Sequence, residues 1–308
     1  MKSHRIVFFG SDAICLPALD YLFAAEGRPG ELAGVVSQPD RARGRGRKVT
    51  PNPVAAWAEA RGVPLRRPEK PDAELAEALR AEGVTLALVM AYGHFLPKAL
   101  REAPARGMVN FHASLLPKYR GASPVETAIA EGETESGVCL MEVVKAMDAG
   151  GVADVERFRI GDTDTAPEVR ARAGEAVVPL LERRLGELLA GRARFEPQDG
   201  ARASFCRKIT KEDGAIDFTL PAKAIYDRWR AFQPWPGAYF EHGGTRVRAG
   251  RTERLPPDAA DRPPGTVVAT VGGVTVATGD GLVRFHELQR PGGKLLRAEE
   301  FLRGYTIR

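Results

Sequence analysis

The sequence predicts a doubly wound α/β domain with a mostly parallel sheet, followed by a small β-barrel domain of the OB type. Buried strand-like runs alternate with helical segments over residues 1–191, which is the pattern of a parallel sheet covered by helices on both faces. Short β-like runs broken by Gly and Pro follow after Pro197, as in small barrels. The length of 308 residues favours two domains over one.

The first domain opens with the buried run "IVFFGS", which predicts a strand and the turn that ends it. Apolar runs predict three further strands in "LAGVVSQ", "TLALVMAYG" and "GMVNFHASLLP". Helical spacing predicts helices in "LPALDYLFA" and "NPVAAWAEARG", the first with Pro17 near its start. A single long helix is expected from about Thr165 to Gly191, with a kink at Pro179.

The second domain is expected to be all-β apart from one helix in "PAKAIYDRWRAF". Its strand-like runs are "FCRKI", "GAIDF", "GAYFEHGG", "TRVRAGRTERL" and "GTVVATVGGVTVATGDGLVRFHELQ". The polar stretch around "RARFEPQDGAR" marks the boundary. We therefore expect a catalytic domain over 1–191, a linker over 192–206 and a second domain over 207–308.

The cysteines and the charge distribution indicate the cellular compartment and the kind of partner. The three cysteines are far apart, and no CxxC or Cys/His spacing for a metal is present, which favours a reducing cytoplasm. No apolar run reaches the length of a membrane span. The net charge of +5 is unevenly placed, since residues 201–308 carry +6 and residues 1–200 carry −1. This basic C-terminal third predicts an anionic partner, with nucleic acid the leading candidate, although a solubility bias would give the same balance.

The candidate site lies where the fourth predicted strand ends. Alternation places Asn110 and His112 on one face of that strand, and ligands of such sheets bind beyond the carboxyl ends of the strands. Further on, Asp148 follows a strand and lies in a glycine turn. Imidazole can exchange a proton near neutral pH, a carboxylate can hold it, and a carboxamide can donate to an oxyanion. No Ser or Cys lies in a nucleophile elbow, so direct attack by a substrate amine on a bound acyl group is indicated.

A basic loop follows the second predicted strand. Within eight residues it holds five cations interleaved with Gly44 and Gly46, namely Arg41, Arg43, Arg45, Arg47 and Lys48. Five cations can neutralise phosphates of a nucleic acid and give salt-dependent binding. The alternative is a solvated surface loop that binds nothing. The loop lacks the Gly-Lys-Ser/Thr of a P-loop, and the chain has no GxGxxG after its first strand, which disfavours a dinucleotide cofactor.

"NFHASLLPKYRGASPVETAI" followed by "MDAG" resembles the folate-dependent formyltransferases. The resemblance implies a Rossmann-like catalytic domain and transfer of a formyl group from 10-formyltetrahydrofolate to an amine, without a metal. It assigns catalysis to Asn110, His112 and Asp148. It also implies a folate-contacting loop of Ser114, Leu115, Leu116 and Pro117.

Other motifs, among them "SQPDRARGRGRKVTPNPV", "AFQPWPGAYF" and "ELQRPGGKLLRAEEFLRG", resemble the members of this family that act on initiator methionyl-tRNA. The resemblance implies that the basic loop enters the acceptor arm and that the C-terminal OB-type domain holds the tRNA. It implies neither a membrane nor an obligate protein partner. Two alternatives stay open, a formyltransferase for an amino sugar nucleotide or another small amine, and an RNA-binding protein with a decayed site.

Overall fold

The computed structural model describes residues 4–24, 29–43, 48–257 and 262–307. Two compact units are distinguished by their internal contacts. The first comprises residues 1–124, 135–159 and 170–206, and the second comprises 125–134, 160–169 and 207–308. Among the described residues, no helix is both long and apolar enough to cross a membrane.

The first unit is built on a seven-stranded sheet of order β10-β9-β7-β6-β1-β2-β5. The bounds of these strands are β1 His4–Phe9, β2 Gly30–Val36, β5 Leu65–Arg66, β6 Val84–Val89, β7 Met108–His112, β9 Glu135–Glu142 and β10 Val152–Arg159. From β5 to β7 all neighbours are parallel, whereas β9 and β10 are antiparallel to their neighbours. The four strands predicted from the sequence are therefore in the parallel part of the sheet, which confirms the predicted fold class.

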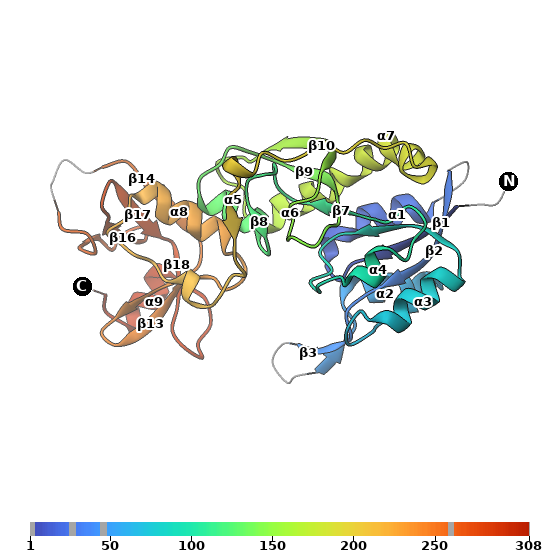
Figure 1. Ribbon diagram of the computed structural model, residues 1–308. Helices are drawn as coiled ribbons and strands as arrows, with labels where there is room; N and C mark the ends of the chain where they lie inside the picture. Colours follow the sequence, from blue (N-terminus) through green and yellow to red (C-terminus); the bar gives the residue numbers. More distant parts are fainter. Residues whose placement is uncertain (1–3, 25–28, 44–47, 258–261, 308) are drawn as a thin grey trace. The chain divides into compact units, whose positions relative to one another are not determined.

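Helices cover both faces of this sheet (Figure 1). Their bounds are α1 Leu16–Phe23, α2 Pro53–Arg61, α3 Ala73–Ala81, α4 Lys98–Arg101 and α7 Val177–Ala190, with the 3-10 turns η1 Ala13–Cys15 and η2 Gly200–Arg202. Helix α5 (Pro124–Ala130) falls almost wholly in the second unit, and α6 (Ala166–Glu175) is divided between the two units. Helix α1 packs against α2 and α7, and α3 packs against α4. The run "IVFF" of β1 is at most 1% exposed because helices shield both its faces.

The long helix predicted from Thr165 to Gly191 is two helices, so that prediction was wrong in detail. Helix α6 ends at Glu175 and α7 begins at Val177, which places Pro179 in the first turn of α7 rather than at a kink. A proline ring clashes with the carbonyl of the residue four positions earlier, and that residue is Glu175. The break therefore lies one turn before the proline that causes it.

The second unit holds two four-stranded antiparallel sheets, of order β12-β13-β18-β19 and β14-β17-β16-β15. The bounds are β12 Ala238–His242, β13 Thr245–Ala249, β14 Thr252–Leu255, β15 Val267–Ala269, β16 Val274–Ala277, β17 Leu282–Phe285, β18 Glu287–Gln289 and β19 Leu296–Arg297, with η3 Glu212–Gly214 and helices α8 Ala222–Ala231 and α9 Ala298–Gly304. Phe240 and Phe285 stack in its core at a centroid distance of 5.3 Å. The predicted helix in "PAKAIYDRWRAF" is α8, whereas α9 was not predicted.

Two short strand pairs complete the fold. Strand β11 (Phe205–Cys206) pairs in parallel with β8 (Arg120–Gly121), so the "FCRKI" run begins in the first unit and not among the barrel strands. Strands β3 (Arg41–Arg43) and β4 (Lys48–Thr50) form an antiparallel pair. The β8–β11 pair brings the segment before residue 207 against the loop that follows β7, where the candidate site lies.

Candidate active site

The end of β7 places Asn110 and His112 on one face of the sheet. Asn110 is opposite Val89 of β6 and Met141 of β9, and His112 is opposite Cys139 of β9. His112 is only 5% exposed, whereas Asn110 is half-buried. Within the described part of the chain, the Asn110 carboxamide makes no hydrogen bond. Asn110 can therefore donate to a substrate oxygen without first breaking an internal contact.

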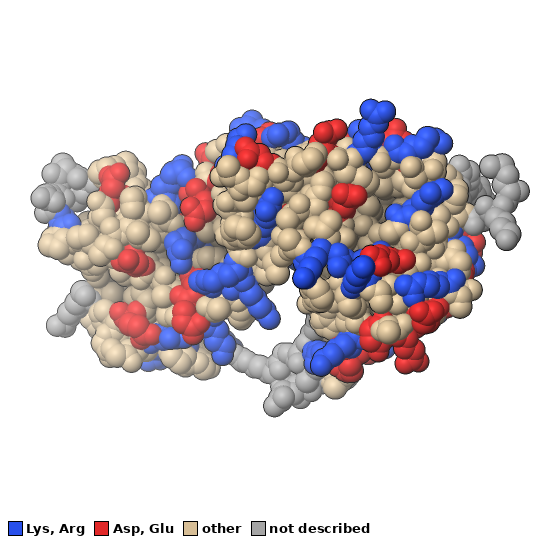
Figure 2. All heavy atoms as spheres, in the orientation of Figure 1, with Lys and Arg blue, Asp and Glu red and all other residues tan. Residues whose placement is uncertain are grey.

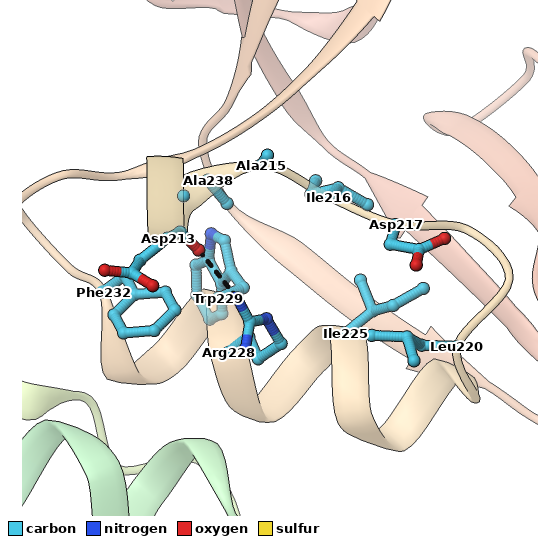
Figure 3. A pocket seen from close by; sticks show the side chains of 11 residues that line it. Asp213, Ala215, Ile216, Asp217, Leu220, Ile225, Arg228, Trp229, Phe232 and Ala238 are labelled. Carbon is cyan, nitrogen blue, oxygen red and sulfur yellow. Dashed lines mark hydrogen bonds between the residues drawn. The ribbon is translucent and has the colours of Figure 1, made fainter. Parts of the chain in front are cut away.

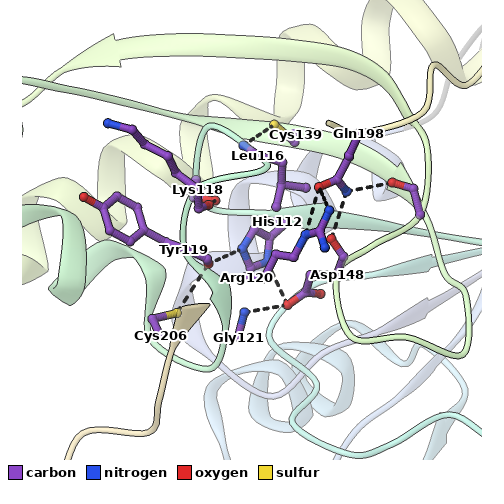
Figure 4. A network of polar contacts seen from close by, with 12 residues as sticks. His112, Leu116, Lys118, Tyr119, Arg120, Gly121, Cys139, Asp148, Gln198 and Cys206 are labelled. Carbon is purple, nitrogen blue, oxygen red and sulfur yellow. Dashed lines mark hydrogen bonds and ion pairs between the residues drawn. The ribbon is translucent and has the colours of Figure 1, made fainter. Parts of the chain in front are cut away.

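The contacts of the His112 ring give its two nitrogens different roles (Figure 4). Nε2 lies 2.9 Å from the Tyr119 carbonyl oxygen, which can only accept, so Nε2 carries a hydrogen. Nδ1 lies 3.6 Å from Oδ2 of Asp148, close enough for an ion pair and too long for a hydrogen bond. Nδ1 is thus the nitrogen that can act on a substrate, and Nε2 anchors the ring.

Asp148 is held in a tight turn beyond β9. Its φ of +49° lies in the left-handed region that non-glycine residues rarely adopt. Its Oδ2 accepts a hydrogen bond of 2.8 Å from the Gly121 N–H. Gly121 has φ +130°, and a Cβ there would lie 2.0 Å from the Cys206 carbonyl oxygen. Only glycine fits at position 121, and its N–H fixes the carboxylate that faces the imidazole.

The "SLLP" loop closes on its own backbone. Ser114 is fully buried and its Oγ donates to the Lys118 carbonyl at 2.6 Å. The Leu116 N–H lies 3.3 Å from Sγ of Cys139, and Leu115, Leu116 and Pro117 are half-buried. The serine therefore shapes the loop, while the three following residues supply the surface that remains accessible.

Arg120 and Gln198 belong to the same site, and the sequence did not indicate them. Arg120 is 9% exposed, and its Nε and Nη2 both donate to Oε1 of Gln198, at 3.0 and 2.8 Å. Nε2 of Gln198 donates to the carbonyls of Asp148 and Gly150, at 2.8 and 2.7 Å. Gln198 lies in the segment expected to be a linker, 50 residues from Asp148, and no local pattern could have linked the two.

The predicted basic loop is a β-hairpin at its base. Arg41 pairs with Thr50 and Arg43 with Lys48 across β3 and β4, while Arg45 and Arg47 lie outside the described residues. The Arg41 side chain is 59% exposed, and its Nη2 lies 3.5 Å from a Glu69 oxygen. At least this guanidinium is therefore on the surface, where a phosphate could reach it.

A buried polar network supports the base of this hairpin, and it too was not predicted. The Ser37 hydroxyl donates to Oδ1 of Asn52 at 2.9 Å, and Nδ2 of Asn52 donates to the Gln38 carbonyl at 3.0 Å. Oδ1 of Asn52 also caps α2 by accepting from the N–H groups of Val54 and Ala55. Ser37 and Asn52 are at most 1% exposed, so the chain leaving β2 is rigidly held.

The cysteines do not supply a nucleophile in this structure. All three are buried, and none forms a disulfide with another. Burial raises the pKa of Cys15 to about 12 and that of Cys139 to about 11, so both remain protonated at neutral pH. Sγ of Cys206 donates to the Tyr119 carbonyl at 3.3 Å, the oxygen that also anchors His112. Among the described residues, no group of His, Cys, Asp or Glu is arranged to hold a metal ion.

One pocket of the second unit contains none of the predicted catalytic residues (Figure 3). It is lined in part by Arg228, Trp229 and Phe232, and Nη2 of Arg228 donates to the Asp213 carbonyl at 3.0 Å. Figure 2 shows Lys and Arg interspersed with Asp and Glu over the visible face of the molecule.

The fold and the site define a formyltransferase, and the chain belongs to the formyl transferase family. The family's formyl transferase domain matches residues 4–185, and its C-terminal domain matches residues 208–306.

Relatives across nearly the whole chain are methionyl-tRNA formyltransferases. One from Thermus thermophilus is 42% identical, covering 98% of this chain and 97% of the relative. That of Moorella thermoacetica is 38% identical with the same coverage. These identities extend over both predicted domains.

Solved structures share the fold at low identity. The methionyl-tRNA formyltransferase of Clostridium thermocellum has a TM-score of 0.58 at 18% identity and covers 90% of this chain and 100% of its own. An N-formyltransferase of Helicobacter canadensis, in complex with folinic acid and dTDP-3-aminofucose, has a TM-score of 0.69 at 17% identity, with coverages of 93% and 99%. The same fold therefore occurs both in a methionyl-tRNA formyltransferase and in an N-formyltransferase bound to folinic acid and dTDP-3-aminofucose.

Proposed function

We propose that this protein transfers the formyl group of 10-formyltetrahydrofolate to the α-amine of methionine on initiator tRNA, for translation initiation. One observation carries the proposal most strongly. The chain is 42% identical to a methionyl-tRNA formyltransferase over almost its full length, and it brings Asp148 to 3.6 Å from His112, which follows Asn110 by two residues on β7. A carboxamide, an imidazole and a carboxylate are groups that can serve the transfer of an acyl group to an amine.

The chemistry follows from the orientation of these groups. The neutral amine attacks the formyl carbon, a new C–N bond forms, and the carbonyl oxygen becomes an oxyanion. Asn110 and a protonated Nδ1 of His112 donate to this oxygen, and Asp148 opposes the charge of the imidazolium at 3.6 Å. The bond from the formyl carbon to N10 of the folate then breaks. Asp148 accepts the proton that the amine loses, Nδ1 gives its own proton to N10, and the proton on Asp148 then passes to Nδ1, which restores both groups.

The accessible residues suggest how the substrates bind. We assign the folate to the surface formed by Leu115, Leu116 and Pro117, with Ser114 shaping that loop from within. We assign the tRNA acceptor arm to the β3–β4 hairpin and the segment between its strands, and the body of the tRNA to residues 207–308. The cations of that hairpin and segment are Arg41, Arg43, Arg45, Arg47 and Lys48. Three buried cysteines that form no disulfide with one another fit a protein of the reducing cytoplasm.

The experiment that tests this function compares three formyl acceptors. The purified protein is incubated with 10-formyltetrahydrofolate and initiator methionyl-tRNA, an amino sugar nucleotide or glycinamide ribonucleotide, and release of tetrahydrofolate is followed. We expect release only with the tRNA. Turnover with the sugar nucleotide instead would assign the chain to the sugar-modifying members of this fold. No turnover with any acceptor would favour an RNA-binding protein without activity.

A further inference from the structure

Gln198 connects a buried cation to the turn that carries Asp148. Arg120, on β8, directs two N–H groups at Oε1 of Gln198. On its other side, Gln198 directs Nε2 at the carbonyls of Asp148 and Gly150. These four hydrogen bonds form a continuous chain from β8 to the Asp148 turn, as Figure 4 shows.

The chemistry of the partners leaves the Gln198 amide one orientation. A guanidinium only donates and a carbonyl only accepts, so the amide oxygen must face Arg120 and the amide nitrogen must face the turn. Rotating the amide by 180° would oppose donors to donors and acceptors to acceptors at all four contacts. Arg120 therefore fixes the orientation of the Gln198 amide, and that orientation directs the amide nitrogen at the two carbonyls of the turn.

The turn needs such support because its conformation is unfavourable by itself. Asp148 has φ +49°, in the left-handed region that residues other than glycine rarely adopt. Two carbonyls of this turn are directed at one amide nitrogen. Any relaxation of the turn would move the Asp148 carboxylate away from the Gly121 N–H and from Nδ1 of His112.

We propose that Gln198 and Arg120 are positioning residues for formyl transfer, which hold Asp148 at its working distance from His112. This inference rests on the proposed function. Neither residue is assigned a contact with the reacting atoms, and both act through the backbone of the Asp148 turn. The segment that follows α7 is accordingly part of the active site and more than a connection between the two domains.

The discriminating variant is Gln198→Glu, because it keeps the contact of residue 198 with Arg120 and removes its hydrogen bonds to the Asp148 turn. The new carboxylate keeps its acceptor toward Arg120 and gains an ionic partner there. Its second oxygen, however, opposes the two carbonyls that Gln198 now donates to, so the turn must open. We expect kcat to fall by about 10²-fold, the loss typical of a 1 Å misplacement, with KM for both substrates within about twofold of wild type. If Gln198 merely fastened its segment to Arg120, kcat would be retained.

Hydrogen exchange gives a second measurement that needs no activity. The Gly121 N–H is protected by Asp148, so its exchange should be at least about tenfold faster in Gln198→Glu if the turn opens. Exchange at the wild-type rate, or wild-type kcat, would overturn the proposal. If the wild-type protein formylates no acceptor, the proposed function fails. The hydrogen-exchange rate of the Gly121 N–H in Gln198→Glu, compared with wild type, then tests by itself whether Gln198 holds Asp148 in place.

Two further variants complete the test. Arg120→Lys retains the charge but cannot offer the paired donors of a guanidinium, and it should lower kcat by about tenfold and speed the same exchange. Asp20→Asn is the control. Asp20 on α1 accepts hydrogen bonds from Trp57 and Arg61 on α2, and the bond from the indole is 2.7 Å long, as short as the bond from Gln198 to the Gly150 carbonyl. This variant replaces a carboxylate by an amide of the same shape, the reverse of Gln198→Glu, in the same unit. It should leave kcat and the hydrogen-exchange rate of the Gly121 N–H unchanged.

Discussion

The exchange Asp148→Asn tests how much of the catalysis depends on charge. The amide oxygen of asparagine can still accept from the Gly121 N–H, so the turn is retained while the negative charge opposite His112 is lost. Two unit charges 3.6 Å apart attract by about 4–5 kcal/mol at an effective dielectric constant of ~20. If this attraction stabilises the imidazolium of the transition state, kcat should fall by about 10³-fold.

The assay is steady-state formylation of initiator methionyl-tRNA, with kcat and KM determined for the wild type, Asp148→Asn, His112→Ala and the double variant. KM for both substrates should change little, because the lost interaction acts mainly in the transition state. The double variant should be hardly slower than the slower single variant, since the two groups act as one unit. Losses that multiply fully, or a drop in kcat of less than about tenfold, would refute a coupled pair.

Three other expectations follow from the sequence and structure. Asn110→Ala should lower kcat by about 10²–10³-fold, as for a lost oxyanion donor, and retention of more than about half the turnover would remove Asn110 from the mechanism. Arg45→Ala should lower kcat/KM mainly for initiator tRNA, measured beside a tRNA with a strong terminal pair over a salt series, and unchanged kinetics on both would make the loop a solvated surface. A hydrogen bond from Arg207 lowers the pKa of Asp213 from 3.8 to about 2. This pair therefore stabilises the fold above about pH 4 and ceases to do so as the pH falls through about 2. Arg207→Ala should accordingly lower Tm at pH 6 and leave it unchanged below pH 2, whereas an equal shift at both pH values would show that charge is not involved.

The sequence by itself was sufficient for the fold class, for the parallel strands β1, β2, β6 and β7, and for proposing Asn110, His112 and Asp148 as catalytic residues. The uninterrupted apolar runs of β1, β2 and β6 predict strands buried on both faces, and this is what the sheet contains. Asn110 and His112 share a face because side chains alternate along β7, a strictly local property. The prediction that Asp148 would join them depended on the topology of such sheets, which directs functional groups to the carboxyl ends of their strands.

Other features depended on contacts between distant segments. The break between α6 and α7 follows from Pro179, yet its position at Ala176 depends on where the ring meets the carbonyl of Glu175. Pairing of β11 with β8 cannot be inferred from two residues, Phe205 and Cys206, that have no periodicity of their own. Residues 125–134 and 160–169 cluster with the second unit, although they lie within the stretch expected to be one continuous domain.

Arg120 and Gln198 show most clearly what cannot be predicted from the sequence alone. Asn110, His112 and Asp148 could be proposed from the sequence because the motif that contains them resembles that of a known family. Gln198 can be recognised only once Arg120 and the carbonyls of Asp148 and Gly150 are placed around it. A single glutamine in a polar stretch has no periodicity, and its role arises from backbone groups 48 and 50 residues away. The tertiary structure alone brings those groups within hydrogen-bonding distance.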